Sequence, residues 1–221
     1  MAWPVGSTQQ ISRLFPRARP ALGSIVGASL VAGALMAAQA GAAIPGCTVA
    51  ALSALGVSGV TITSATDVAA TASAPEYCHV LGSVASPSGN PNRDGFALDL
   101  PASWSGRFLM SGGGGFAGSV AGANRAALSK GFAVASTDTG HRGGDASWAI
   151  SAPHVPAQGA VTDYYHLAVH NVTVAGKQLA TRFYRGSISY AYFQGCSTGG
   201  RQALVAAERY PDDFDEIKWR G

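Results

Sequence analysis

The sequence predicts an α/β domain with a mostly parallel sheet, and three observations lead to this prediction. Short apolar runs alternate with helical segments along the chain, which is the pattern of a sheet covered by helices. A Gly-x-Ser-x-Gly motif lies between the last strand of this series and the helix that follows it. Four consecutive glycines follow an earlier strand. With 221 residues, 47% of them hydrophobic, the chain is long enough for one domain with a sizeable core.

The first 40 residues are expected to be a secretory signal peptide. Arg13, Arg17 and Arg19 form a basic region, residues 22–38 are apolar, and residues 38–40 read Ala-Gln-Ala, a cleavage site. Removal takes away three of the 15 basic residues and none of the 12 acidic ones, so the net charge falls from +3 to zero. No basic cluster remains for nucleic acid, and no later stretch approaches the roughly 20 apolar residues of a membrane span. We therefore expect a secreted or periplasmic protein.

The stretch Gly195-Cys196-Ser197-Thr198-Gly199 is expected to be a nucleophile elbow. The apolar run from Ile188 to Phe193 predicts a buried strand before it, and residues 201–210 predict a helix that stops at Pro211. A tight turn between the two would expose the hydroxyl of Ser197. It would also place the Thr198 N–H at a helix N-terminus, where developing negative charge is favoured. The alternative is a glycine-rich turn with an ordinary exposed serine.

The four glycines at 112–115 follow the short strand expected at residues 107–110. Such a backbone can present convergent N–H groups, and esterases use a loop of this kind as one oxyanion donor. The alternative is a flexible surface loop. Two other stretches are expected to be regular: residues 96–100 as an edge or half-buried strand, and residues 121–130 as a helix.

Two pairs of polar residues are weaker candidates for a site. Asp138 and His141 follow the buried strand 132–136, at the strand end where open α/β sheets bind ligands. They either line a site or hold the loop by hydrogen bonds, and we favour the second. His166 and His170 have the i, i+4 spacing of a metal pair on a helix expected over residues 163–185. No third ligand accompanies them, so we expect them to pack or to face water.

Three cysteines follow the leader, an odd number for an exported protein. Cys47 and Cys78 bracket a short N-terminal segment and are a candidate disulfide. Cys196 is then left beside Ser197. It is a buried free thiol, a reactive thiol, or one half of a disulfide whose partner is missing.

Four motifs resemble the tannase/feruloyl esterase family and occur within residues 47–215: residues 112–118, 135–141, 145–149 and 193–204. The resemblance implies an α/β-hydrolase with a lid inserted before the acid of a Ser-Asp-His triad. It implies that Ser197 is the nucleophile and that Cys196 pairs with a cysteine beside the catalytic histidine. The backbone N–H of Thr198 and that of Gly114 or Gly115 would form the oxyanion hole. The substrate would be a small aromatic ester. A structural calcium would belong to the lid, with no metal or cofactor in this chain.

The sequence departs from the family after the elbow helix. Lys218 and Arg220 are poor residues for the buried strand that should follow. All five histidines precede Ser197, whereas hydrolases place the acid and then the histidine after the serine. We therefore predict that residues 41–221 are the N-terminal part of such a hydrolase, truncated after the elbow helix and inactive by themselves. The alternatives are another exported serine esterase or depolymerase, and a non-catalytic chain.

Overall fold

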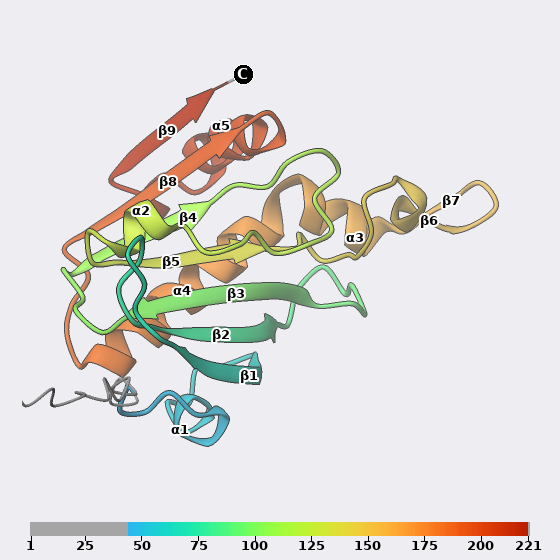
Figure 1. Ribbon diagram of the computed structural model, residues 1–221. Coiled ribbons are helices and arrows are strands. Elements are labelled where there is room, and N and C mark those ends of the chain that lie inside the picture. The colour runs from blue at the N-terminus through green and yellow to red at the C-terminus, as the bar shows by residue number, and fades with distance from the viewer. Residues whose placement is uncertain (1–43, 221) are drawn as a thin grey trace, which may run out of the picture. The chain divides into compact units, whose positions relative to one another are not determined.

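The computed structural model describes residues 44–220, which are organised around a seven-stranded sheet with the order β1-β2-β3-β5-β4-β8-β9 (Figure 1). The expected signal peptide, residues 1–40, lies outside the described residues. The strands of this sheet are β1 (Val60–Val68), β2 (Tyr77–Val84), β3 (Asp94–Pro101), β4 (Arg107–Ser111), β5 (Phe132–Thr137), β8 (Tyr190–Cys196) and β9 (Glu216–Arg220). A separate small hairpin consists of β6 (Ile150–Ala152) and β7 (Val155–Pro156).

Strand pairing divides the sheet into two halves. The antiparallel half consists of β1, β2 and β3, and β3 also pairs antiparallel with β5. The parallel half consists of β5, β4, β8 and β9. The predicted α/β fold is confirmed, with parallel pairing confined to this second half. Because parallel strands end at the same edge of a sheet, β4, β5 and β8 bring the segments that follow Ser111, Thr137 and Cys196 to one edge.

The two faces of the sheet are covered unequally. Phe108, Met110 and Phe193 are fully buried on the face that packs against α4 (Ala168–Tyr184) and α5 (Thr198–Arg209). Leu109 and Val134 alternate to the other face, where they join a smaller cluster with the short α2 (Arg125–Leu128). The alternation follows from the period of two along a strand. The larger buried cluster therefore lies on the face that α4 and α5 cover, and α5 is the helix that follows the serine motif.

One long helical run crosses from the parallel half toward the antiparallel half. It consists of α3 (Gln158–Thr162), a π-helical segment (Asp163–Leu167) and α4. The helix predicted over 163–185 therefore begins five residues early, at Gln158, and ends in a left-handed residue, Arg185, with φ 51°. A π segment interrupts the regular ladder and is frequent at functional sites.

Two further expectations are corrected by the structure. β3 lies inside the sheet rather than at an edge, because β1 and β2 extend the sheet beyond it. The helix expected over 121–130 is reduced to Arg125–Leu128, and its cap is the side chain of Asn124, which accepts from the Ala127 N–H. Lys218 and Arg220 lie in β9 with both side chains exposed, so this strand is not the buried one for which they are poor residues.

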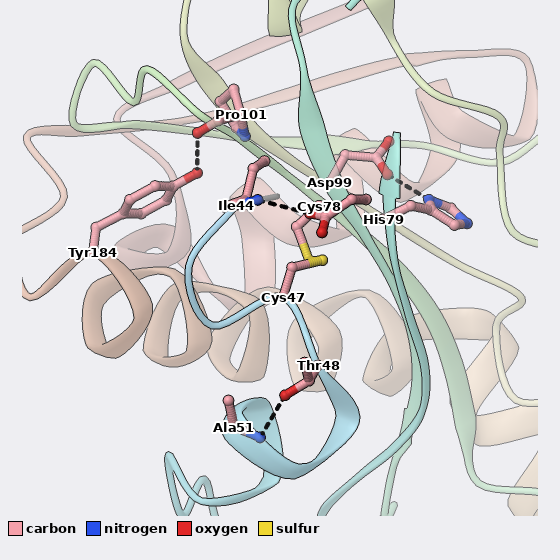
Figure 2. The surroundings of a disulfide bond; sticks show 10 residues. Ile44, Cys47, Thr48, Ala51, Cys78, His79, Asp99, Pro101 and Tyr184 are labelled. Carbon is pink, nitrogen blue, oxygen red and sulfur yellow. Dashed lines mark hydrogen bonds and ion pairs between the residues drawn. A yellow bond between two sulfur atoms is a disulfide. The ribbon is translucent and has the colours of Figure 1, made fainter. Parts of the chain in front are cut away.

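A disulfide between Cys47 and Cys78 joins the segment before α1 (Val49–Ser53) to β2 (Figure 2). It is the pair that the sequence suggested, and both cysteines are buried.

On β2 and β3, His79 Nδ1 and Asp99 Oδ1 lie 2.6 Å apart, and this hydrogen bond raises the pKa of His79. Tyr184 donates its hydroxyl to the Pro101 carbonyl at 2.7 Å. Across residues 44–220, no helix has the length and apolar character required to cross a bilayer.

Candidate active site

Ser197 occupies a strained turn between β8 and α5. Its backbone has φ 55° and ψ −118°, a combination that a residue with a Cβ adopts only when the surrounding structure holds it there. A Cβ added at Gly195 would lie 2.4 Å from the Gly199 carbonyl oxygen, so strand and helix approach too closely for a side chain. Ser197 is exposed. The predicted strand, turn and helix are all present, and this turn presents the serine at the carboxyl edge of the sheet.

The N-terminus of α5 lies directly beside this serine. Thr198 is the first residue of this 12-residue helix. The Ser197 carbonyl accepts from the N–H groups of Gly200 and Arg201, at 2.8 and 3.1 Å. The Thr198 N–H donates to no acceptor within residues 44–220. It is an unpaired donor at the positive end of a helix dipole.

The loop after β4, residues Gly112–Ala117, packs against the start of α5 and is called the glycine loop below. A Cβ at Gly112 would lie 2.8 Å from the Gly199 Cα, so the two backbones are in direct contact. The Gly112 N–H donates to the Gln194 carbonyl at 2.8 Å, and the Gly113 N–H donates to Gln202 Oε1 at 2.9 Å. Within the described part of the chain, the N–H groups of Gly114 and Gly115 have no acceptor. Unpaired donors therefore lie on both neighbouring segments.

Asp138 and His141 form hydrogen bonds that hold the loop after β5. Asp138 Oδ1 accepts from the N–H groups of Gly95 and Gly140, at 2.8 and 2.9 Å. His141 Nε2 lies 2.7 Å from the Phe116 carbonyl oxygen, which only accepts, so Nε2 carries the proton. Burial raises the pKa of Asp138 and lowers the pKa of His141. These contacts agree with the interpretation that both residues hold the loop.

His166 and His170 each hydrogen-bond to a different side chain. His166 Nδ1 lies 2.9 Å from the Tyr210 hydroxyl, and His170 Nδ1 lies 2.8 Å from Asp213 Oδ2. Among residues 44–220, no group of three or more His, Cys, Asp or Glu side chains is arranged to hold a metal ion.

Cys196 precedes the strained serine and is exposed, with a free thiol in the described structure. Of the three alternatives for Cys196, its exposure contradicts the buried free thiol, and the other two stay predictions. A polar hollow of about 450 Å³ opens beside it, at the ends of β4, β8 and β9. It is lined by Ser111, Gly112, Asn124, Gln194, Gly195, Cys196, Lys218, Trp219 and Arg220.

Sequence analysis did not single out Gln202, although it contacts the glycine loop. It is 3% exposed on the buried side of α5, together with Gly199, Ala203 and Ala206. A long polar side chain among small buried residues is the signal that would have indicated it, because buried polar groups require partners.

A buried carboxylate pair was also missed. Asp94 is fully buried, and its Oδ2 accepts from Asn171 Nδ2 at 2.7 Å, whereas its Oδ1 has no partner in the described structure. Asp163, the first residue of the π segment, accepts from the hydroxyl of Ser86 and, at 2.8 Å, from Asn90 Nδ2. Burial, with the negative charges of Asp163 and Asp138 nearby, raises the pKa of Asp94 to about 7. Asp94 therefore stays protonated to a higher pH than an exposed aspartic acid does.

The fold and the strained serine place the chain in the class of α/β-hydrolases. Its solved neighbours include an esterase from Aspergillus oryzae, with a TM-score of 0.69 and 25% identity over 80% of this chain and 37% of that chain. Feruloyl esterase B from Aspergillus oryzae has a TM-score of 0.63 and 30% identity, over 73% of this chain and 34% of that one.

The chain belongs to the tannase and feruloyl esterase family, because the sequence model of that family matches residues 78–218. The predicted family is thereby confirmed. The mono(2-hydroxyethyl) terephthalate hydrolase of Piscinibacter sakaiensis is 36% identical over 165 residues, which are 67% of this chain and 27% of that protein. Feruloyl esterase B of Aspergillus niger is 40% identical over 119 residues, 53% of this chain and 22% of that protein. The chain thus spans about a quarter of the length of these curated relatives.

Proposed function

We propose that this chain carries the nucleophile of a serine carboxylic-ester hydrolase that cleaves esters of phenolic or other aromatic acids. The observation that carries the proposal is Ser197, held at φ 55° between β8 and α5 with unpaired N–H groups beside it. Backbone strain at an exposed hydroxyl is a reason to infer function. The names of two relatives, a feruloyl esterase and a mono(2-hydroxyethyl) terephthalate hydrolase, favour an aromatic acyl group.

The proposed reaction is acyl transfer in two steps. A base removes the proton from Ser197 Oγ as this oxygen attacks the ester carbonyl carbon, and the alcohol leaves with a proton returned by the base. The negative charge on the former carbonyl oxygen is met by the N–H of Thr198 and by that of Gly114 or Gly115. Loss of one such donor typically costs about 3 kcal/mol of transition-state stabilisation. Water then attacks the acyl-enzyme and releases the acid.

The base and its acid partner are assigned to residues outside these 221. All five histidines precede Ser197. His79, His141, His166 and His170 each hydrogen-bond to groups other than Ser197. We infer that the chain by itself turns over esters very slowly, since removal of a comparable triad costs about 10⁶ in rate. The calcium-bearing lid of the family belongs, on the same proposal, to those outside residues.

Export from the cytoplasm is part of the proposal. The disulfide between Cys47 and Cys78 supports an oxidising compartment, because structural disulfides are rare in the cytosol. The leader expected at residues 1–40 agrees with it. Periplasm and extracellular space both satisfy these observations.

Acylation of Ser197 with added imidazole tests the nucleophile directly. Imidazole supplies the base, and p-nitrophenyl ferulate supplies an activated aromatic ester whose p-nitrophenolate leaves with the bonding electrons. We expect one feruloyl group per chain, mapped by mass spectrometry to Ser197. The adduct should be lost in Ser197→Ala and kept in Ser187→Ala, which removes another exposed serine. Labelling of Ser197→Ala equal to that of the wild type would sink the proposal. A ratio of ferulate to acetate rates no higher than the ratio for imidazole alone would exclude an aromatic preference.

A further inference from the structure

Side chains from three other segments grip the glycine loop at Gly113, Gly115 and Phe116. From α5, Gln202 Oε1 accepts from the Gly113 N–H at 2.9 Å, and the Thr198 hydroxyl donates to the Gly115 carbonyl. From the π segment, the Tyr164 hydroxyl donates to the same carbonyl at 3.4 Å. From the loop after β5, His141 Nε2 donates to the Phe116 carbonyl at 2.7 Å.

Gly114 lies between Gly113 and Gly115, and none of these side chains binds its backbone. A Cβ added there would meet nothing within 4 Å, and its N–H has no acceptor in the described residues. The contacts on either side of Gly114 therefore fix the direction in which its peptide group points. Oxyanion donors act through such preorganisation, because no reorientation is then needed during the reaction.

Of the side chains that hydrogen-bond to the glycine loop, Gln202 is the one whose burial is hardest to explain by packing. It is 3% exposed, and its Nε2 has no partner in the described structure. Burying an unpaired amide N–H is unfavourable, and an apolar side chain of similar size would fill the space without that cost. What the glutamine supplies is an acceptor for Gly113, because the atom facing an N–H group must be its oxygen.

We propose that Gln202 is a positioning residue of the candidate oxyanion hole, which holds the Gly113 N–H so that the Gly114 N–H faces the substrate carbonyl. This proposal rests on the proposed function of Ser197 and Thr198. Gln202 and Thr198 lie on the same helix, α5, so the donors from the loop and from the elbow are held by one rigid element. Positions within about 0.5 Å matter for such sites, and a shared helix keeps both donors in register.

Arg201, the residue before Gln202 on α5, contacts the π segment that carries Tyr164. Arg201 donates to the carbonyls of Tyr164 and Tyr165, at 3.0 and 2.9 Å, and its guanidinium lies 4.5 Å from the centre of the Tyr164 ring. Trp148 packs on Tyr164 and stacks on His141, with ring centres 4.8 and 4.1 Å apart. Tyr164, which binds Gly115, therefore contacts α5 through Arg201. His141, which binds Phe116, is linked to Tyr164 through Trp148.

Amide hydrogen exchange of the 221-residue chain, measured by NMR, tests the role of Gln202. We expect Gln202→Met to speed exchange at Gly113 by tenfold or more, because the acceptor is lost while the length of the side chain is kept. Gln202→Glu should restore protection, since either protonation state of a glutamate retains an accepting oxygen. Leu204→Met, at a position 54% exposed on the same helix, is the matched control and should change nothing.

A second measurement covers the case in which Gln202→Met unfolds the chain and all amides exchange rapidly. In the wild type, a scalar coupling across the hydrogen bond should join the Gly113 nitrogen to the side-chain carbonyl carbon of Gln202. The proposal is overturned if this coupling is absent, or if Gly113 exchanges equally slowly in Gln202→Met and in the wild type.

The acylation assay separates this proposal from the proposed function. We expect Gln202→Met to slow imidazole-assisted acylation of Ser197 by about tenfold or more, with Gln202→Glu recovering most of the rate. Acylation at the wild-type rate in Gln202→Met would refute the positioning role while leaving Ser197 as the nucleophile. Absence of acylation in the wild type, with Gly113 exchange responding as expected, would instead refute the proposed function and leave only a structural role for Gln202.

Discussion

The antiparallel and parallel halves of the sheet differ in how completely their groups are satisfied. In the antiparallel half, β1, β2 and β3 have nine, eight and eight residues and pair along most of their length. A disulfide joins β2 to the segment before α1. In the parallel half, β4 has five residues. β4 is followed by the glycine loop, and β8 is followed by Ser197 at φ 55°. N–H groups in both of these segments remain unpaired.

The two halves tolerate backbone strain to different extents. An unpaired donor or a positive φ at a non-glycine residue costs stability, and it persists only where the surrounding structure compensates. In the antiparallel half, Arg93 directly before β3 also has a positive φ, 57°, and the pairing of β1 with β2 is regular apart from a shift in register between Ile62 and Ser64. The carboxyl edge of the parallel half holds the features that ester chemistry would use. Three substitutions test this division of roles.

Loss of the disulfide should have the largest effect. Cys47→Ser removes a covalent link between residues 31 positions apart, and a loop of that size corresponds to about 3–4 kcal/mol of unfolding free energy. Urea unfolding under non-reducing conditions measures the change. Cys196→Ser, which alters the exposed free thiol, is the matched control and should be close to neutral. Equal effects of the two substitutions would mean that the antiparallel half does not depend on its disulfide.

Asp94 lies at the boundary between the halves and should make stability depend on pH. Its folded pKa is raised from 3.8 to about 7 by burial and by Asp163 and Asp138. The unfolded chain ionises earlier, so the stabilising contribution is present below about pH 4 and is lost as the pH rises to about 7. Asp94→Asn keeps an acceptor for Asn171 and does not titrate. Its stability relative to the wild type should therefore increase by roughly 2 kcal/mol from pH 5 to pH 8.

Urea unfolding at both pH values measures this difference. Asp212→Asn, at an exposed position, controls for the loss of one negative charge. Identical pH dependence of the wild type and Asp94→Asn would show that the buried carboxylate is not what limits stability at the boundary.

Relief of strain at the elbow should have the smallest effect, and in the opposite direction. Ser197→Gly removes the side chain from a backbone with φ 55°, which glycine adopts readily. The gain is partly offset by the greater freedom of glycine in the unfolded chain, so we expect about 1 kcal/mol of stabilisation, or about 3 °C in Tm. Ser197→Ala keeps the Cβ and should show no gain. A lower Tm for Ser197→Gly than for Ser197→Ala in thermal melts would argue against stored strain.

Much of the parallel half could be predicted from the sequence, because its signals are local. The apolar run before Gly195, the small residues around Ser197 and the stop at Pro211 depend only on neighbouring positions. They predicted β8, the turn and α5. The strand at 96–100 was expected to be an edge or half-buried strand, because the pattern of a strand carries no information about which strands flank it. Lys218 and Arg220 argued only against a buried strand, and β9 is exposed at both positions.

The sequence by itself determined the family, the location of the strained serine and the glycine loop, since each is written in a few adjacent residues. Only the tertiary structure decided how the loop is held and where the buried charges lie. Gln202 meets Gly113 across 89 residues, and Asn171 meets Asp94 across 77. Such pairs form when separate elements pack on one sheet. Their hydrogen bonds are set by three-dimensional distance and burial, which no local pattern of residues records.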